Sequence, residues 1–204
     1  MAITKKTPAV KQSVGAQYIC FATDIDPLTY DTAVEKSETV KNISTTENAE
    51  MVPVRASGAI YKNVVGPSDI EISTEVVAFV AETLAKMKGE TTDTGGLVLS
   101  GAPAERPTFG YGKVVKLDGG IVRYEWFPKC QLVGNTDDIG TSEDSFKEQN
   151  DTLTIKAQPF DAAGNTKTYV QSDMTTFPTG LTEDEFFAKP ILTPADLLAA
   201  NPIV

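Results

Sequence analysis

The chain has 204 residues, of which 41% are hydrophobic, so it is large and apolar enough to bury a core and does not have the composition of a disordered protein. Its formal net charge is −10, and its body holds no cluster of Lys and Arg, which argues against tight binding of nucleic acid. There is no histidine, which excludes Ser-His-Asp and Cys-His catalysis and His-ligated metal sites.

The charges are distributed unevenly along the chain. Residues 24–50 hold seven acids against two lysines, and residues 131–151 hold six acids against one lysine. The first twelve residues contain no acid and three bases, Lys5, Lys6 and Lys11. Solvated loops around a neutral core are the simplest explanation, and a surface that repels polyanions is the more specific one.

The N-terminal residues 1–15 have no hydrophobic period, and we expect them to form a flexible arm. Their lysines are not followed by an apolar run, so we expect neither a signal peptide nor a membrane-spanning segment. We expect synthesis in a reducing cytosol. Cys20 and Cys130 lie in apolar runs without a CxxC pair, which favours buried free thiols over a disulfide.

Several strands are predicted before residue 73. The first is 17–22, and the longer 34–44 alternates as a largely solvated strand does. Met51–Ala56 contains Pro53, which suits an edge strand or a loop arm. After a turn at Ser57-Gly58, we expect 59–65 and 69–72 to pair around Gly66-Pro67.

A single long helix is predicted over Thr74–Lys88, with Ser73 as N-cap and Gly89 just beyond its end. Apolar residues at helical spacing form one face: Val76, Val77, Val80, Ala81, Leu84 and Met87. Glu82, Thr83 and Lys86 lie away from the centre of that face. Such a helix must pack on an apolar surface, and the surrounding sequence predicts a β-sheet.

The clearest hairpin joins 108–117 to 121–128 through Asp118-Gly119-Gly120, because Asp-Gly tolerates the positive φ angles of a tight turn. Its second strand places Val122, Tyr124 and Trp126 on one face. Residues 131–150 then form a long acidic segment, which at this length indicates disorder or a contact arm.

The last third contains strands at 151–160 and 167–171 and two helix starts. Thr182 with Glu185 forms a capping box, and Thr193-Pro194 is an N-cap followed by proline. The fold class predicted is mainly β: an antiparallel β-sandwich or partial barrel with one flanking α-helix and extended loops. We divide the chain into an arm (1–15), a β-sandwich domain (16–172, with helix 74–88) and a C-terminal extension with short helices (173–204).

Catalytic signatures are weak. Paired carboxylates occur at Asp24/Asp26, Asp137/Asp138, Glu143/Asp144 and Glu183/Asp184/Glu185, but they stand in polar links or at a helix start and lack the calcium-loop pattern. Tyr124, Trp126 and Phe127 suit a sheet core better than a base-stacking platform, because only Arg123 and Lys129 supply charge nearby. We therefore assign no catalytic, cofactor-binding or metal residues, and no cofactor.

The order of elements resembles the major tail tube proteins of long, non-contractile-tailed phages of Gram-positive bacteria. The resemblance covers about residues 33–169 and is carried by three tracts: Met51–Ala59, Gly66–Lys88 and Ile121–Lys129. The acidic segment, which contains Phe146, and the strand that follows it come in the expected order.

The resemblance implies a structural virion protein that forms hexameric rings, stacked into a tube through which DNA is ejected into the host. It implies a virion location after synthesis in the bacterial cytoplasm, self-association, and contacts with tape measure, tail terminator and distal tail proteins. DNA would pass without specific binding. Residues 41–56 and 131–150 are the expected ring-to-ring contacts, and Lys5, Lys6 and Lys11 are expected to meet acidic loops of a neighbour.

Two other classes of function remain open from the sequence. A non-catalytic β-sandwich module for carbohydrate or cell-surface binding would use exposed aromatic residues, with Val122, Tyr124 and Trp126 as candidates. An enzyme that uses carboxylates alone would depend on residues such as Asp137 and Glu143.

Overall fold

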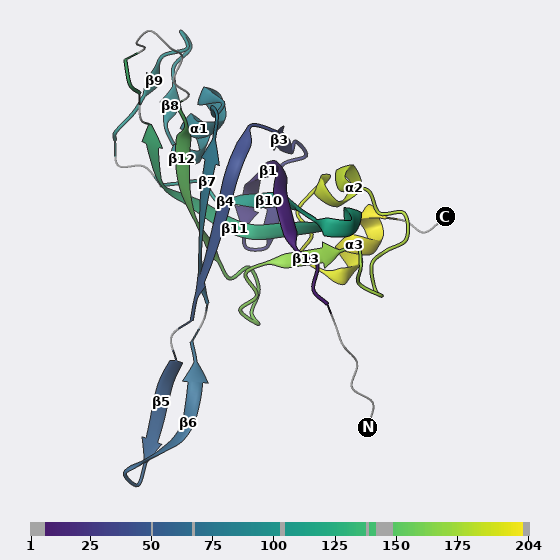
Figure 1. Cartoon of the computed structure of the whole chain (residues 1–204). Helices are drawn as coiled ribbons and strands as arrows, with labels where there is room; N and C mark the ends of the chain where they lie inside the picture. Colours follow the sequence, from purple (N-terminus) through teal and green to yellow (C-terminus); the bar gives the residue numbers. More distant parts are fainter. Residues whose placement is uncertain are drawn as a thin grey trace.

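Figure 1 shows the computed structural model of the chain, which describes residues 7–49, 51–66, 68–102, 105–137, 139–141 and 149–201. The described residues form mostly strands: β1 (Lys11–Ile25), β2 (Leu28–Tyr30), β3 (Glu35–Ser37), β4 (Val40–Asn48), β5 (Met51–Ala56), β6 (Ala59–Val65), β7 (Asp69–Val76), β8 (Thr91–Thr92), β9 (Val98–Leu99), β10 (Phe109–Leu117), β11 (Val122–Asp137), β12 (Asp151–Gln158) and β13 (Thr168–Gln171). The helices are α1 (Ala81–Lys88), the 3-10 turn η1 (Asp118–Gly120), α2 (Glu183–Phe187) and α3 (Pro194–Ala200).

Nine strands make one antiparallel sheet in the order β2-β1-β10-β11-β12-β7-β4, with β3 also paired to β1 and β13 also paired to β11. The sheet is curled, as contacts inside it between strands that are not neighbours in the sheet order show. The Gln17 side-chain oxygen of β1 accepts hydrogen bonds from Tyr111 of β10 (3.1 Å) and from Thr74 of β7 (3.2 Å). The predicted class, a mainly β antiparallel fold with few helices, is confirmed.

Each face of the curled sheet has its own hydrophobic cluster, because successive residues of a strand point to opposite faces. The inner cluster contains Tyr111, Phe127 and Ile155, and Met87 of α1 packs into it. The outer cluster contains Tyr18 and Trp126 of the sheet together with residues that follow β13: Leu181, Phe186, Phe187 and Ile191. A sheet with apolar side chains on both faces needs a cover on each, and α1 and the C-terminal helices provide them.

The C-terminal segment is anchored by aromatic stacking. The Phe187 ring lies parallel to Tyr18 with 3.9 Å between ring centroids, and the Trp126 indole N–H donates to the Phe186 carbonyl at 3.1 Å. Gly112 makes room for this, since a Cβ there would lie 2.7 Å from the Phe187 ring. Both predicted helix starts are confirmed: Thr182 forms a capping box with Glu185, and Thr193 caps α3 ahead of Pro194 and also forms a capping box with Asp196. Part of the expected extension 173–204 therefore completes the outer cluster.

The predicted start of the long helix is wrong. Residues 74–76 continue β7, where they pair with both β12 and β4, and the helix begins at Ala81. β-Branched residues such as Thr74 and Val76 fit a strand paired on both sides, so tertiary pairing outweighs the helical spacing. Its end is as predicted, because Gly89 adopts a left-handed conformation with φ 70°.

The face of α1 also differs from the prediction. Thr83 is buried and donates a hydrogen bond to Glu35, whereas Val77 and Val80 are exposed. Glu82 and Lys86 are exposed as expected, and the Lys86 ammonium lies 4.0 Å from the centre of the Phe21 ring.

Three strand predictions need correction. Strand 59–65 pairs with β5, and β7 pairs with β12 and β4, so the expected pairing around Gly66-Pro67 is wrong. The predicted flexible N-terminal segment does not extend to residue 15, because Lys11 already pairs with Leu117 of β10. The segment 34–44 divides into β3 and β4, which join different neighbours, β1 and β7.

The acidic segment 131–150 is also shorter than predicted. Residues up to Asp137 continue β11, because they pair with β12 along its length. Residues 138 and 142–148, which include Phe146, lie outside the described residues. The hairpin through Asp118-Gly119-Gly120 and the strand that begins at Asp151 are confirmed.

Candidate assembly surfaces

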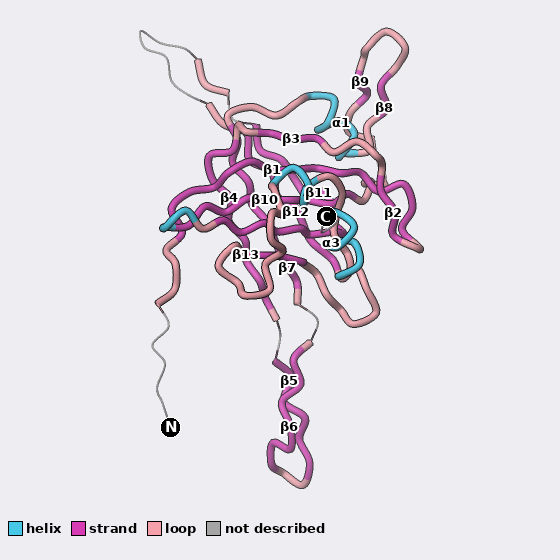
Figure 2. Tube along the Cα trace, turned by 90° about the vertical axis from the view of Figure 1, so that its right-hand side faces the viewer, coloured by secondary structure: helices cyan, strands magenta, loops and turns pink. Residues whose placement is uncertain are grey.

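The β5–β6 hairpin, which we name the arm, extends away from the sheet as a two-stranded ribbon (Figures 1 and 2). It is an insertion between β4 and β7, whose paired residues Asn48 and Asp69 mark its base. Ser57 (φ 51°) and Gly58 (φ 79°) form its tight turn. Every residue of β5 and β6 is exposed. A two-stranded ribbon alone in water is only marginally stable, so the arm needs a partner surface.

The arm is both apolar and basic. Its exposed large hydrophobic residues are Met51, Val52, Val54, Ile60, Tyr61, Val64 and Val65. Met51 pairs across the ribbon with Val65, and Val52 with Val64, so apolar side chains lie opposite one another. Residues 51–65 contain two bases and no acid in a chain of net charge −10. An exposed apolar surface of this kind marks a contact site, and its charge favours an acidic partner.

A second exposed apolar hairpin lies at the opposite end of the molecule (Figures 1 and 2). Strands β8 and β9 pair only with each other among the described residues. Leu97, Val98 and Leu99 are exposed there. The two ends of the molecule therefore carry different apolar projections.

The long sheet has an unpaired edge at β4, since no described strand pairs with its outer side. The residues of β4 are mostly polar and exposed, from Val40 to Asn48. An open edge presents unpaired backbone N–H and C=O groups and is a template for pairing with another chain. Residues 41–43 and 45 of this edge face β1 across a cavity, so the part most open to another chain is the end at Asn48.

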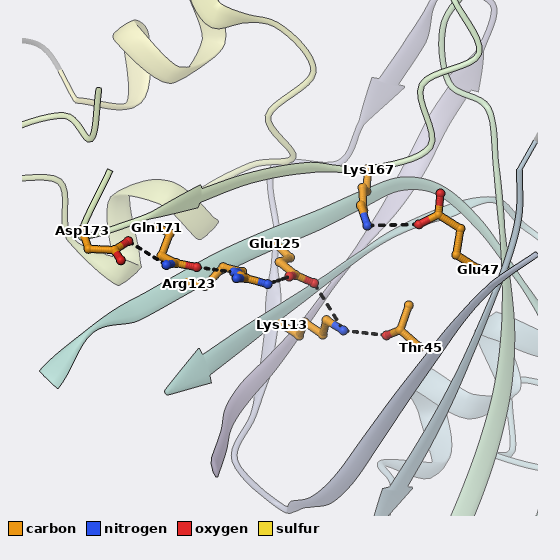
Figure 3. A network of polar contacts seen from close by, with 8 residues as sticks. All are labelled: Thr45, Glu47, Lys113, Arg123, Glu125, Lys167, Gln171 and Asp173. Atoms are coloured by element: carbon orange, nitrogen blue, oxygen red, sulfur yellow. Dashed lines mark hydrogen bonds and ion pairs between the residues drawn. The ribbon is translucent and has the colours of Figure 1, made fainter. Parts of the chain in front are cut away.

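A polar network crosses the open part of the curl (Figure 3). The buried ammonium of Lys113 lies 3.3 Å from the Glu125 carboxylate and donates to the Thr45 hydroxyl at 2.6 Å. Arg123 lies 3.5 Å from Glu125 and donates to Gln171 at 2.7 Å. Burial lowers the pKa of Lys113, and the Glu125 carboxylate opposes that shift. These contacts join β4, β10, β11 and β13, so we interpret the network as a structural one that holds these four strands together.

The residues considered for sugar or base stacking are not available for binding. Trp126 and Tyr124 are buried beneath Phe186 and Phe187, which confirms the favoured interpretation as a sheet core and overturns the alternative of an exposed binding face. The sequence did not identify the cover, because it comes from sixty residues later in the chain, as the Trp126–Phe186 hydrogen bond shows.

The carboxylate pairs also have structural roles where they are described. Asp24 accepts from the backbone N–H of Ile25 and Asp26, Glu185 caps α2, and Glu183 accepts from the Tyr18 hydroxyl. Asp137 ends β11, and residues 138, 143 and 144 lie outside the described residues.

Both thiols are buried and unpaired, as predicted. Burial raises the pKa of Cys20 to about 11 and raises that of Cys130 still further, so neither thiol forms a reactive thiolate near neutral pH. In the part of the chain that the structure describes, no three His, Cys, Asp or Glu side chains are grouped as they would be around a metal ion. No helix within the described ranges has the length and apolarity needed to cross a bilayer.

These features define a mainly β protein with two exposed apolar hairpins and an unpaired sheet edge among its described residues. Comparison with known families agrees: the model of the phage tail tube protein family matches residues 28–189. The chain belongs to the phage tail tube protein family, which confirms the resemblance and implies a structural, non-enzymatic role in the phage tail. No curated protein matches the chain.

Solved structures also resemble the chain, and one of them does so at low identity. It is a chain in the "Cryo-EM structure of the anti-feeding prophage (AFP) baseplate, 6-fold symmetrised", with 13% sequence identity and a TM-score of 0.41. The alignment covers 82% of this chain and 97% of that one.

Proposed function

We propose that the chain is the repeating subunit of a non-contractile phage tail tube. In this role it forms hexameric rings that stack into a conduit for DNA ejection, without catalysis. The observation that carries the proposal is the arm, an exposed apolar ribbon that gains stability only by lying on another surface.

Stacking is supported by the placement of the two hairpins. The arm and the β8–β9 hairpin lie at opposite ends and differ in sequence, so a contact between one end and the other end of a second copy is heterologous. Heterologous contacts do not close after two subunits, and where the rotation between copies does not form a closed ring they propagate into filaments and tubes. We assign the arm and the β8–β9 hairpin to opposite ring-to-ring faces.

Ring formation is supported by the open edge of β4. Pairing between this edge and a neighbour's sheet would satisfy its backbone groups and continue the sheet around the ring. The six-fold count follows from the family resemblance. A net charge of −10 suits a conduit that repels DNA instead of binding it. Tape measure, tail terminator and distal tail proteins are the partners at the two ends of the tube.

The structure suggests a specific test. Because Asn48 and Asp69 are paired, a two-residue Asn-Gly turn can replace residues 49–68 and leave β4 and β7 joined as a hairpin. We expect the intact chain to form large species in light scattering as its concentration rises, and the shortened chain to unfold at the same temperature but not to stack. Tubes formed equally well by the shortened chain would exclude the arm as the stacking element.

A further inference from the structure

We propose that a cleft between β2 and the C-terminal helices is the docking site for the N-terminal segment of a neighbouring copy, recognised through Lys5 and Lys6. The inference rests on the proposed function, because it requires copies to lie side by side in an assembly. Beyond the proposed function, it names the segment that docks, the N-terminal one, and the cleft that receives it.

The cleft has a volume of about 830 Å³ and an apolar floor with acidic residues around it. Leu28 and Tyr30 line it from the β2 side, and Pro190 and Leu192 line it from the C-terminal segment. Four of its lining residues are acidic, Asp31, Asp184, Glu185 and Asp196, and one, Lys189, is basic. Lys189 is already paired with Asp196 at 3.5 Å, so the cleft as a whole carries uncompensated negative charge.

The N-terminal segment has the complementary chemistry. Residues 1–12 contain three lysines and no acid, in a chain with ten more acids than bases. Ile3 precedes Lys5 and Lys6, so an apolar side chain and two ammonium groups occur within four residues. A segment of this kind can place Ile3 on the apolar floor while its lysines meet Asp31 and Asp184.

A chain cannot readily fill its own cleft. Lys5 lies six residue positions before Lys11, a span of about 20 Å when the chain is fully extended. Lys11 pairs with Leu117 at one end of β1, whereas Tyr30 pairs with Ala22, eleven residues further along the strand, a path of about 36 Å. The β2 side of the cleft, with Leu28, Tyr30 and Asp31, is thus beyond the reach of Lys5 of the same chain, and a lysine that meets Asp31 comes from a second copy.

The test uses the full-length chain in assembled form. Ile3→Cys combined with Ala199→Cys places one thiol in the segment and one on a lining residue of the cleft, and a short bismaleimide then joins thiols that lie close together. The natural Cys20 and Cys130 are buried and do not compete. The matched control is Ile3→Cys with Ala162→Cys, which is exposed in the turn after β12 and does not line the cleft.

We expect covalent multimers from the cleft pair at least tenfold above the control pair, and only under assembly conditions. Charge reversal at Lys5 and Lys6 to Glu should lower this yield at least fivefold, and Asp31→Lys with Asp184→Lys should restore it in the reversed chain. Tubes that form normally with cleft crosslinking no higher than the control would overturn this inference and leave the proposed function intact. A chain that forms no tubes at any concentration would overturn both.

Discussion

The arm offers a direct measurement of assembly energy through the double substitution Ile60→Ser/Tyr61→Ser. These side chains are 54% and 79% exposed in the isolated chain, and Tyr61 is the extra residue in a bulge of the ribbon. Full burial of a large apolar side chain is worth about 1.5–3 kcal/mol. Scaled by the exposed fractions, the pair contributes about 3 kcal/mol per subunit on stacking, or about a hundredfold in the concentration at which assembly begins.

The same change should leave the isolated subunit almost unaffected. Neither residue belongs to a hydrophobic cluster of the body, so the free energy of unfolding should change by no more than about 0.5 kcal/mol. Sedimentation across a concentration series measures assembly, and thermal unfolding measures stability. Met174→Ser is the control, because Met174 is 42% exposed, outside both the arm and the lining of the cleft. Equal assembly thresholds for the double variant and the unmodified chain would refute the role given to the arm.

Three further predictions concern the body of the fold. Phe187→Ala removes the ring that stacks on Tyr18 and should lower the free energy of unfolding by about 3–5 kcal/mol in urea titrations followed by Trp126 fluorescence. Lys113→Met leaves the Glu125 carboxylate without its nearest cation and should destabilise by about 2–4 kcal/mol, whereas Lys113→Met/Glu125→Leu should recover most of that loss. Hydrogen bonds from Thr182 lower the pKa of Glu185. Burial raises the pKa of Asp196, but hydrogen bonds from Thr193 outweigh it, so that pKa is also lowered. These caps should therefore stabilise α2 and α3 above about pH 4 and lose that contribution as the pH falls through the lowered pKa values.

Each of these three has a contradicting result. Unchanged urea midpoints for Phe187→Ala would mean that the C-terminal segment does not complete the outer cluster. If the double variant at Lys113 and Glu125 is as unstable as the single variant, the ion pair itself stabilises the curled sheet, and the loss does not come from an unpaired Glu125 carboxylate. For the caps, the readout is Trp126 fluorescence emission as the pH is lowered. Glu185→Gln should reduce the change in emission below pH 4. An emission change in that variant equal to that of the unmodified chain would contradict the role given to Glu185.

Local signals in the sequence predicted the local features of the fold. Asp118-Gly119 specifies its hairpin through residues that tolerate positive φ, and Thr182 with Glu185 specifies a capping box within four residues. Gly89 marks the helix end for the same reason of backbone conformation. These motifs act within a few residues, so no tertiary information is needed to predict them.

Features that depend on distant pairing were predicted less well. Thr74 and Val76 suit a strand as readily as a helix end, and only β4 and β12 on either side decide between them. The exposed face of Val122, Tyr124 and Trp126 was an open possibility until the structure placed Phe186 and Phe187 over it. Pro53 correctly indicated an edge strand or arm, but the exposure of the arm's apolar residues depends on what the rest of the chain leaves uncovered.

The most direct measurement of the central claim is negative-stain electron microscopy of the purified chain over a range of concentrations. The proposed function predicts stacked rings of uniform diameter with six-fold end views, appearing at the concentration where sedimentation detects assembly. A strictly monomeric protein at every concentration, with neither rings nor tubes in the images, would contradict it.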